Sequence, residues 1–88
     1  EAMILHKLPA GLSALLPVAA TGKLDRMLRQ RFDLTLSLPS GASPVVRATV
    51  IGVVRTLAEP NRATVFLQFQ EPLQDSRYLC REIAYNHS

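Results

Sequence analysis

The 88-residue chain lacks several features that define whole classes of protein. Its one cysteine, Cys80, cannot form an intramolecular disulfide, as is typical of proteins in the reducing cytoplasm, so we predict a cytoplasmic location. No run of apolar residues approaches the ~20 that cross a bilayer, so we predict no membrane segment. The two histidines, His6 and His87, and the single thiol have no metal-ligand spacing, and we predict neither a metal nor another cofactor.

Patterns typical of catalysis and of phosphate binding are also missing. The four glycines form no glycine-rich phosphate loop. Ser13, His6 and Asp25 are the residue types of a hydrolytic triad, but scattered residues of these types occur in any chain. The sequence therefore favours a protein that is not an enzyme. Its net charge of +3 permits an acidic or phosphate-bearing partner without requiring one.

The middle of the chain carries the clearest pattern, that of three consecutive strands. In residues 32–38 every even position is large and apolar and every odd position is polar, which is a period of two. Turn-rich residues 39–44 lead to a β-branched strand at 45–57, and a second turn leads to a third strand at 63–70. Three antiparallel strands joined by short turns predict a meander. The apolar faces expected in its last two strands are Val46, Ala48, Val50, Gly52 and Val54, and Ala63, Val65, Leu67 and Phe69.

A hairpin is expected before this meander. Residues 2–8 and 12–16 read as short apolar strands, with a turn at Pro9-Ala10-Gly11 between them, and Pro17 ends the second strand. With 88 residues, the chain has room for one domain with a single modest core.

Two helices are predicted in addition. In residues 18–31, which should hold about two helical turns, four residues recur at the spacing of a helix face: Leu24, Met27, Leu28 and Arg31. Residues 73–85 contain neither glycine nor proline, which predicts a C-terminal helix that lays Leu79, Cys80 and Ile83 over an open end of the barrel. The predicted fold is a single mainly β domain over residues 1–88. It is a small antiparallel six-stranded-type β-barrel with a short inserted helix and a C-terminal helix.

The order of these elements resembles that of PilZ domains. The resemblance covers most of the chain and is carried by residues 5–13, which read LHKLPAGLS, then by strands at 32–38, 47–55 and 65–69 and a terminal helix. It implies a six-stranded antiparallel barrel followed by a helix. It also implies a regulatory role in bacterial cyclic di-GMP signalling, which controls motility, pilus or flagellar function and exopolysaccharide production.

Many PilZ domains bind cyclic di-GMP through two motifs, and this chain departs from both. The Asp/Asn-x-Ser-x-x-Gly motif falls on residues 6–11, where His6 replaces the Asp or Asn, Leu8 replaces the Ser, and only Gly11 matches. Lys7 lies within the same motif. Leu8 has no polar atom in its side chain, so it would leave the hydrogen-bonding edge of a guanine unpaired.

The family's other motif, Arg-x-x-x-Arg, suits a nucleotide because arginine pairs with phosphate oxygens and stacks on bases. No arginine precedes His6, and the pair Arg77 and Arg81 has this spacing only at the opposite end of the chain. The resemblance therefore implies a degenerate PilZ-like domain. Such a domain would bind cyclic di-GMP weakly or not at all and would act through a protein partner or a second copy of itself. The alternative is a site completed by residues that precede Glu1.

The predicted inserted helix is the candidate surface for that partner. Basic and apolar side chains alternate along it, namely Lys23, Leu24, Arg26, Met27, Leu28, Arg29 and Arg31. An amphipathic helix that buries its apolar side and solvates its charges would give the same pattern.

Binding of single-stranded nucleic acid is the second functional hypothesis. Small barrels bind single strands by stacking bases on exposed aromatic side chains. Phe66 is the one aromatic residue of the central strands predicted to point outward, near Arg47 or Arg55. The absence of tryptophan and the few cations on the outward faces argue against this function.

Overall fold

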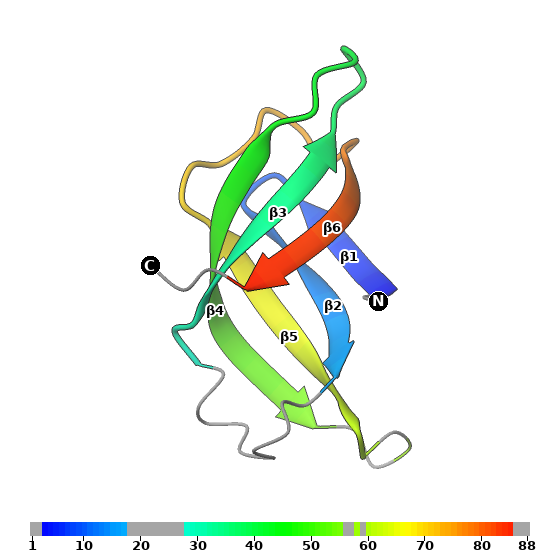
Figure 1. Ribbon diagram of the computed structural model, residues 1–88, viewed down its shortest axis with the longest axis vertical. Helices are drawn as coiled ribbons and strands as arrows, with labels where there is room; N and C mark the ends of the chain where they lie inside the picture. Colours follow the sequence, from blue (N-terminus) through cyan, green and yellow to red (C-terminus); the bar gives the residue numbers. More distant parts are fainter. Residues whose placement is uncertain (1–2, 18–27, 56–57, 59, 86–88) are drawn as a thin grey trace.

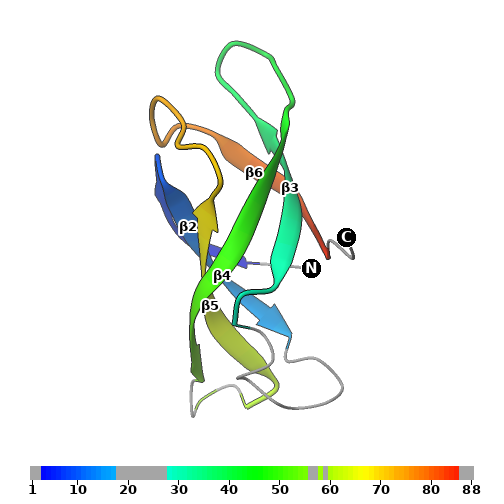
Figure 2. The same ribbon diagram turned by 90° about the vertical axis from the view of Figure 1, so that its left-hand side faces the viewer.

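The computed structural model describes residues 3–17, 28–55, 58 and 60–85 and contains one antiparallel sheet. Its strands, in order along the chain, are β1 (Met3–Leu8), β2 (Gly11–Pro17), β3 (Arg31–Ser37), β4 (Val45–Arg55), β5 (Arg62–Phe69) and β6 (Leu79–Tyr85). Their order across the sheet is β1-β2-β5-β4-β3-β6. The sheet curls into a half-barrel with β1 and β6 at its two edges (Figures 1 and 2). The mainly β fold, the hairpin and the meander are thereby confirmed.

The core fills the inner side of this curled sheet. Strict alternation places Phe32, Leu34 and Leu36 of β3 on that side, and the polar residues between them are more exposed. The expected apolar face of β5 is confirmed, because Ala63, Val65, Leu67 and Phe69 are all buried. The other buried members of the core cluster are Leu12, Ala14, Leu16, Ala48, Val50 and Tyr78.

The expected face of β4 is correct only in the first half of the strand. The pairing with β5 shifts between Val50 and Gly52, so that Val53, not Val54, lies opposite the buried Val65. An extra residue in one strand reverses the alternation beyond it. Val54 is consequently 53% exposed, and the prediction that it faces the core is wrong.

The predicted C-terminal helix is wrong, because residues 79–85 form β6 and pair with β3. Leu36 lies opposite Cys80 and Thr35 opposite Glu82, which leaves Arg81 as an extra residue in β6. This irregularity lets Cys80 and Ile83, three residues apart, both pack against the core. The same spacing is that of a helix face, which is why the sequence pattern misleads. The pairing with β6 also supplies hydrogen-bond partners for the backbone groups of β3. If residues 79–85 were a helix, these groups would remain unpaired at an open edge of the sheet.

Most of the predicted inserted helix lies outside the described residues, and its described end is not helical. Leu28 and Arg29 form a turn, and Arg31 is the first residue of β3. Arg29 has a φ of 67°. Its N–H donates to the Val50 carbonyl (2.8 Å), and the N–H of Val50 donates to the Gln30 carbonyl (2.9 Å). These bonds extend the β3–β4 ladder backwards, so the expectation that Arg31 lies on a helix face is wrong.

Tyr78, just before β6, ties the last part of the chain to the first hairpin. Its side chain is fully buried, and its hydroxyl lies 2.8 Å from the Leu8 carbonyl oxygen and 2.9 Å from that of Gly11. The single hydroxyl proton is therefore shared between two acceptors. In return, Lys7 Nζ donates to the Tyr78 carbonyl (2.9 Å). The ring packs edge-on against Phe69, with centroids 5.6 Å apart.

Burial raises the pKa of the Tyr78 phenol to about 12. The folded protein therefore holds this proton between pH 10 and 12, where an unfolded chain releases it. The corresponding stability is present below pH 10 and is lost as the pH rises through this range.

Replacing Tyr78 with phenylalanine removes the hydroxyl and leaves the Leu8 and Gly11 carbonyls without this donor. We expect a loss of about 1–2 kcal/mol in the free energy of unfolding, measured by urea denaturation at pH 7. Leu79→Ala, a change at an exposed neighbour, should stay within ~0.5 kcal/mol of the wild type. Equal stability of the Tyr78→Phe variant and the wild type would mean that the hydroxyl does not stabilise the β1–β2 hairpin.

The same variant tests the titration of Tyr78. From pH 10 to 12 the wild type should lose more stability than Tyr78→Phe does, because only the wild type carries this phenol. Lysine titration is common to both proteins and cancels in the difference. Parallel stability curves over this pH range would contradict the assignment.

Candidate functional site

A row of side chains crosses the outer face of the sheet, the side away from the core. The register places His6 of β1 opposite Ser13 of β2, Ser13 opposite Phe66 of β5, and Phe66 opposite Gly52 of β4. Four neighbouring strands thus contribute one residue each. Phe66 stands in the middle of this face rather than at an edge.

A hollow of about 410 Å³ lies along this row, and we call it the Phe66 groove. Three of its apolar side chains are strongly exposed, namely Leu8 (61%), Ile51 (59%) and Phe66 (41%). Its polar groups are the imidazole of His6, the hydroxyl of Ser13 and the amide of Gln68. The complete lining is His6, Leu8, Ala10, Gly11, Leu12, Ser13, Ile51, Phe66, Leu67 and Gln68.

Two glycines let the backbones and the Phe66 ring approach closely here. A Cβ atom at Gly11 would overlap the carbonyl oxygen of Leu67 on the neighbouring strand β5. A Cβ atom at Gly52 would lie 3.3 Å from Cδ2 of Phe66, so the ring rests above this glycine. Gly11 is therefore required by the packing of β2 against β5, whether or not a ligand binds.

Ser13 is the one buried polar residue at the floor of the Phe66 groove. It is 3% exposed, and its hydroxyl oxygen has no hydrogen-bond partner among the described residues. Leu12 and Ala14 on either side of it face the core, so alternation directs Ser13 to the outer face. A buried hydroxyl without a partner destabilises the folded state by about 1–3 kcal/mol, so this group calls for an explanation.

The structure brings together three of the four positions predicted from the ligand motif. His6, Leu8 and Gly11 all line the Phe66 groove. Lys7 does not, because its ammonium group bonds to the Tyr78 carbonyl and lies 5.8 Å from the centre of the Tyr78 ring. Phe66, predicted to point outward for a different function, lies in the same groove.

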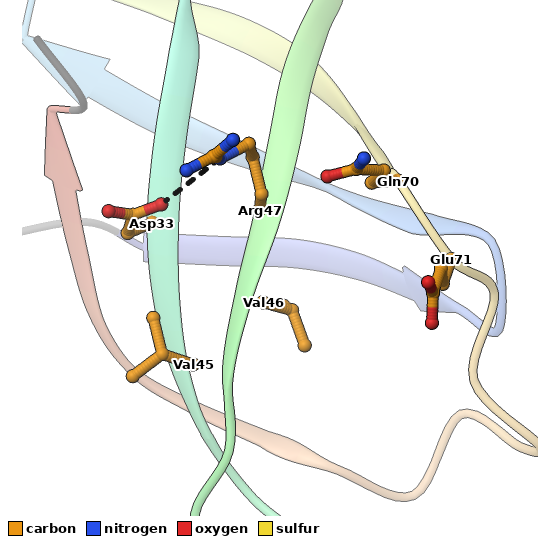
Figure 3. A pocket seen from close by; sticks show the side chains of 6 residues that line it. All are labelled: Asp33, Val45, Val46, Arg47, Gln70 and Glu71. Carbon is orange, nitrogen blue, oxygen red and sulfur yellow. Dashed lines mark ion pairs between the residues drawn. The ribbon is translucent and has the colours of Figure 1, made fainter. Parts of the chain in front are cut away.

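A polar area adjoins the Phe66 groove on the outer face of β3, β4 and β5. In Figure 3 the side chains of Asp33 and Arg47 reach toward each other, with Nε of Arg47 3.9 Å from a carboxylate oxygen of Asp33. Both groups are partly exposed, so this pair contributes only about 0–1 kcal/mol. The pair lies in a hollow of about 390 Å³ that is lined by Asp33, Val45, Val46, Arg47, Gln70 and Glu71.

A third hollow connects the two areas. It has a volume of about 440 Å³ and includes Arg31, Arg47 and Gln68 in its lining. Gln68 also lines the Phe66 groove, so the apolar and basic parts of the outer face are contiguous.

The residues predicted for partner docking are only partly described. Lys23, Leu24, Arg26 and Met27 lie outside the described residues. Leu28 and Arg29 are exposed in the turn before β3, and Arg31 is exposed at its start. These three residues do not line the Phe66 groove.

The arginine pair with the motif's spacing, Arg77 and Arg81, also lies away from the Phe66 groove. The guanidinium of Arg77 bonds to the carboxylate of Asp75 at 2.9 Å. This hydrogen bond lowers the pKa of Asp75 and raises that of Arg77. Arg81 belongs to β6, at the far edge of the sheet from β1.

Ser13 and Gln68 enter the candidate site although the sequence assigns neither of them to a binding motif. A lone serine and a lone glutamine among apolar residues form no recognisable spacing. The available signal is alternation, since both follow a residue that faces the core. Only the strand register reveals that Ser13 stands next to Phe66.

Comparison of the chain with known protein families, with characterised proteins and with solved structures gives no match. Within the described ranges, no group of three or more histidine, cysteine, aspartate or glutamate side chains is placed to hold a metal ion. The described residues also contain no helix that is long and apolar enough to span a membrane.

Two alanine substitutions test the different roles of the glycines. Gly11→Ala should destabilise the protein by about 3 kcal/mol, because β5 must move to make room for the methyl group. Gly52→Ala should change stability by less than ~1 kcal/mol, because the exposed Phe66 ring can shift. Thermal denaturation of the two variants measures the difference. Equal effects would contradict the close approach of β2 and β5 at Gly11.

Proposed function

We propose that this chain is a PilZ-like adaptor domain in bacterial cyclic di-GMP signalling, and that it contacts a partner protein through the Phe66 groove. The observation that carries the proposal is the exposure of Leu8, Ile51 and Phe66 around one hollow. Exposed apolar side chains gathered on one face are typical of protein interaction sites. The resemblance of residues 5–13 and of the first five strands to PilZ domains supports the signalling role, and the antiparallel sheet is compatible with it. The terminal helix that the resemblance also implies is not present, because residues 79–85 form β6 instead.

The chemistry of the Phe66 groove argues against cyclic di-GMP as its occupant. No residue that lines the groove is an arginine or a lysine, whereas the ligand carries two phosphate charges. Leu8 lies where the family motif has a serine and presents only carbon atoms. Gly11, the one residue that matches the motif, is explained by the close packing of β2 against β5. The adaptor would therefore respond to its partner rather than to the nucleotide.

Binding of single-stranded nucleic acid is a second candidate, favoured by the position of Gln68. This side chain links the Phe66 groove to the hollow that Arg31 and Arg47 line. A base stacked on Phe66 could thus have its phosphate near those arginines. Against this function, the carboxylate of Asp33 lies beside Arg47 and offsets part of its charge.

A paired experiment tests the adaptor function. Calorimetric titration of cyclic di-GMP into the wild-type chain should give no saturable heat up to high micromolar ligand. The immobilised chain should capture a defined set of proteins from a lysate of its native cells, measured by quantitative mass spectrometry. Phe66→Asp should reduce that capture about 30-fold, as expected for the loss of a central aromatic contact worth ~2 kcal/mol.

Leu79→Asp is the matched control, because Leu79 is similarly apolar and 62% exposed but lies on β6, at the edge of the sheet. It should leave capture unchanged. Saturable heat with cyclic di-GMP, or equal capture by Phe66→Asp and the wild type, would contradict the adaptor proposal. A labelled oligothymidylate tests the second candidate. If it binds tightly and in a salt-sensitive way, and both Phe66→Asp and Arg47→Ala abolish this binding, the result would favour nucleic-acid binding instead.

A further inference from the structure

We infer that the Phe66 groove receives an aromatic side chain of the partner protein, and that a carbonyl group of the same partner segment accepts a hydrogen bond from Ser13. This inference rests on the adaptor function proposed above. It specifies which chemical groups of the partner enter the groove.

The size and walls of the Phe66 groove suit an aromatic anchor. Its volume of about 410 Å³ is within the range of small-molecule pockets and leaves room for one aromatic side chain. Phe66 on one side and Leu8 on the other offer carbon surfaces, and an incoming ring can pack edge-on or offset against the Phe66 ring. The residues that contribute most binding energy at protein interfaces are enriched in tryptophan, tyrosine and arginine, and they occupy well-packed pockets.

The Ser13 hydroxyl is the buried polar group of the groove that lacks a hydrogen-bond partner among the described residues. It is buried on the outer face without a hydrogen-bond partner among the described residues, so a bound group can satisfy it at no loss of an existing bond. Its two neighbours in the row, His6 and Phe66, are exposed, and exposed side chains change rotamer readily. The inference requires one of these side chains to turn aside, so that the hydroxyl becomes accessible from the groove. An uncharged acceptor fits best, because no lysine or arginine lines this hollow.

Small model compounds allow the contributions of the ring and of the carbonyl group to binding to be measured separately. N-acetyl-tryptophan amide carries both, 3-methylindole carries only the ring, and N-acetyl-leucine amide carries only the carbonyls. In a titration followed by amide chemical shifts, N-acetyl-tryptophan amide should bind in the millimolar range and shift the signals of His6, Ser13, Phe66 and Gln68. We expect 3-methylindole to bind about fivefold more weakly, which corresponds to one hydrogen bond, and N-acetyl-leucine amide not to saturate.

Two variants complete the test. Ser13→Ala should weaken N-acetyl-tryptophan amide about fivefold and leave 3-methylindole unchanged. Its melting temperature should equal or exceed that of the wild type, because the substitution removes a buried hydroxyl that has no partner. Phe66→Ala should abolish binding of both indoles, whereas Leu79→Ala should affect neither.

Several outcomes would overturn the inference. These are the absence of binding, shifts that map away from the Phe66 groove, or equal weakening of both indoles by Ser13→Ala. Preferential binding of guanosine monophosphate over N-acetyl-tryptophan amide would also overturn it. If the indoles fail to bind while Phe66→Asp still abolishes protein capture, the anchor inference fails and the adaptor function stands. If capture is insensitive to Phe66→Asp, the adaptor function itself fails.

Discussion

The buried hydroxyl of Tyr78 joins two parts of the chain that are 67 and 70 residues apart in the sequence. It donates to the carbonyls of Leu8 and Gly11, on either side of the turn between β1 and β2, from a position just before β6. Two backbone bonds reinforce this attachment, from the N–H of Leu73 to the Pro9 carbonyl and from that of Phe69 to the Ala10 carbonyl. The turn is thereby fixed against β5, and its residues become one wall of the Phe66 groove. The geometry of the candidate site thus depends on a contact made on the opposite side of the hairpin.

Sequence patterns were enough to place five of the six strands close to where they lie. Alternation and β-branched residues predicted β3, β4 and β5, and short apolar runs bounded by proline and glycine predicted β1 and β2. Alternation misled in two strands that contain an extra residue, β4 and β6. In β4 the irregularity before Gly52 turned Val53 toward the core, against which it packs partly buried, and left Val54 exposed. A glycine inside a strand often accompanies such a bulge, but it does not mark which residue is extra. In β6 the irregularity at Arg81 gave Cys80 and Ile83 the spacing of a helix, and the choice between helix and strand was decided by the open edge of β3. That requirement belongs to the assembled sheet and is not visible in residues 73–85 alone.

The candidate site could be predicted in its parts but not as a whole. His6, Leu8 and Gly11 were singled out by their positions in a ligand motif that only Gly11 matches, and Phe66 by its outward position in a strand. The two observations pointed to different functions. The register of β1, β2 and β5 places them in one groove. Ser13 joins them only because its neighbours in this row bury it, which is a tertiary effect. The polar area around Arg47 likewise forms from three strands that are consecutive along the chain but carry no shared motif.

Gly11 has an implication for how binding motifs are recognised in small β domains. A ligand motif usually includes residues of two kinds, those that touch the ligand and those that allow the backbone to take its shape. When a domain changes its ligand in the course of evolution, the first kind is free to diverge, whereas the second remains under selection for folding. The Leu67 carbonyl requires a glycine at position 11 in this way, whatever the outer face of the sheet binds. A glycine that matches a ligand motif is then explained by strand packing and carries no information about present binding.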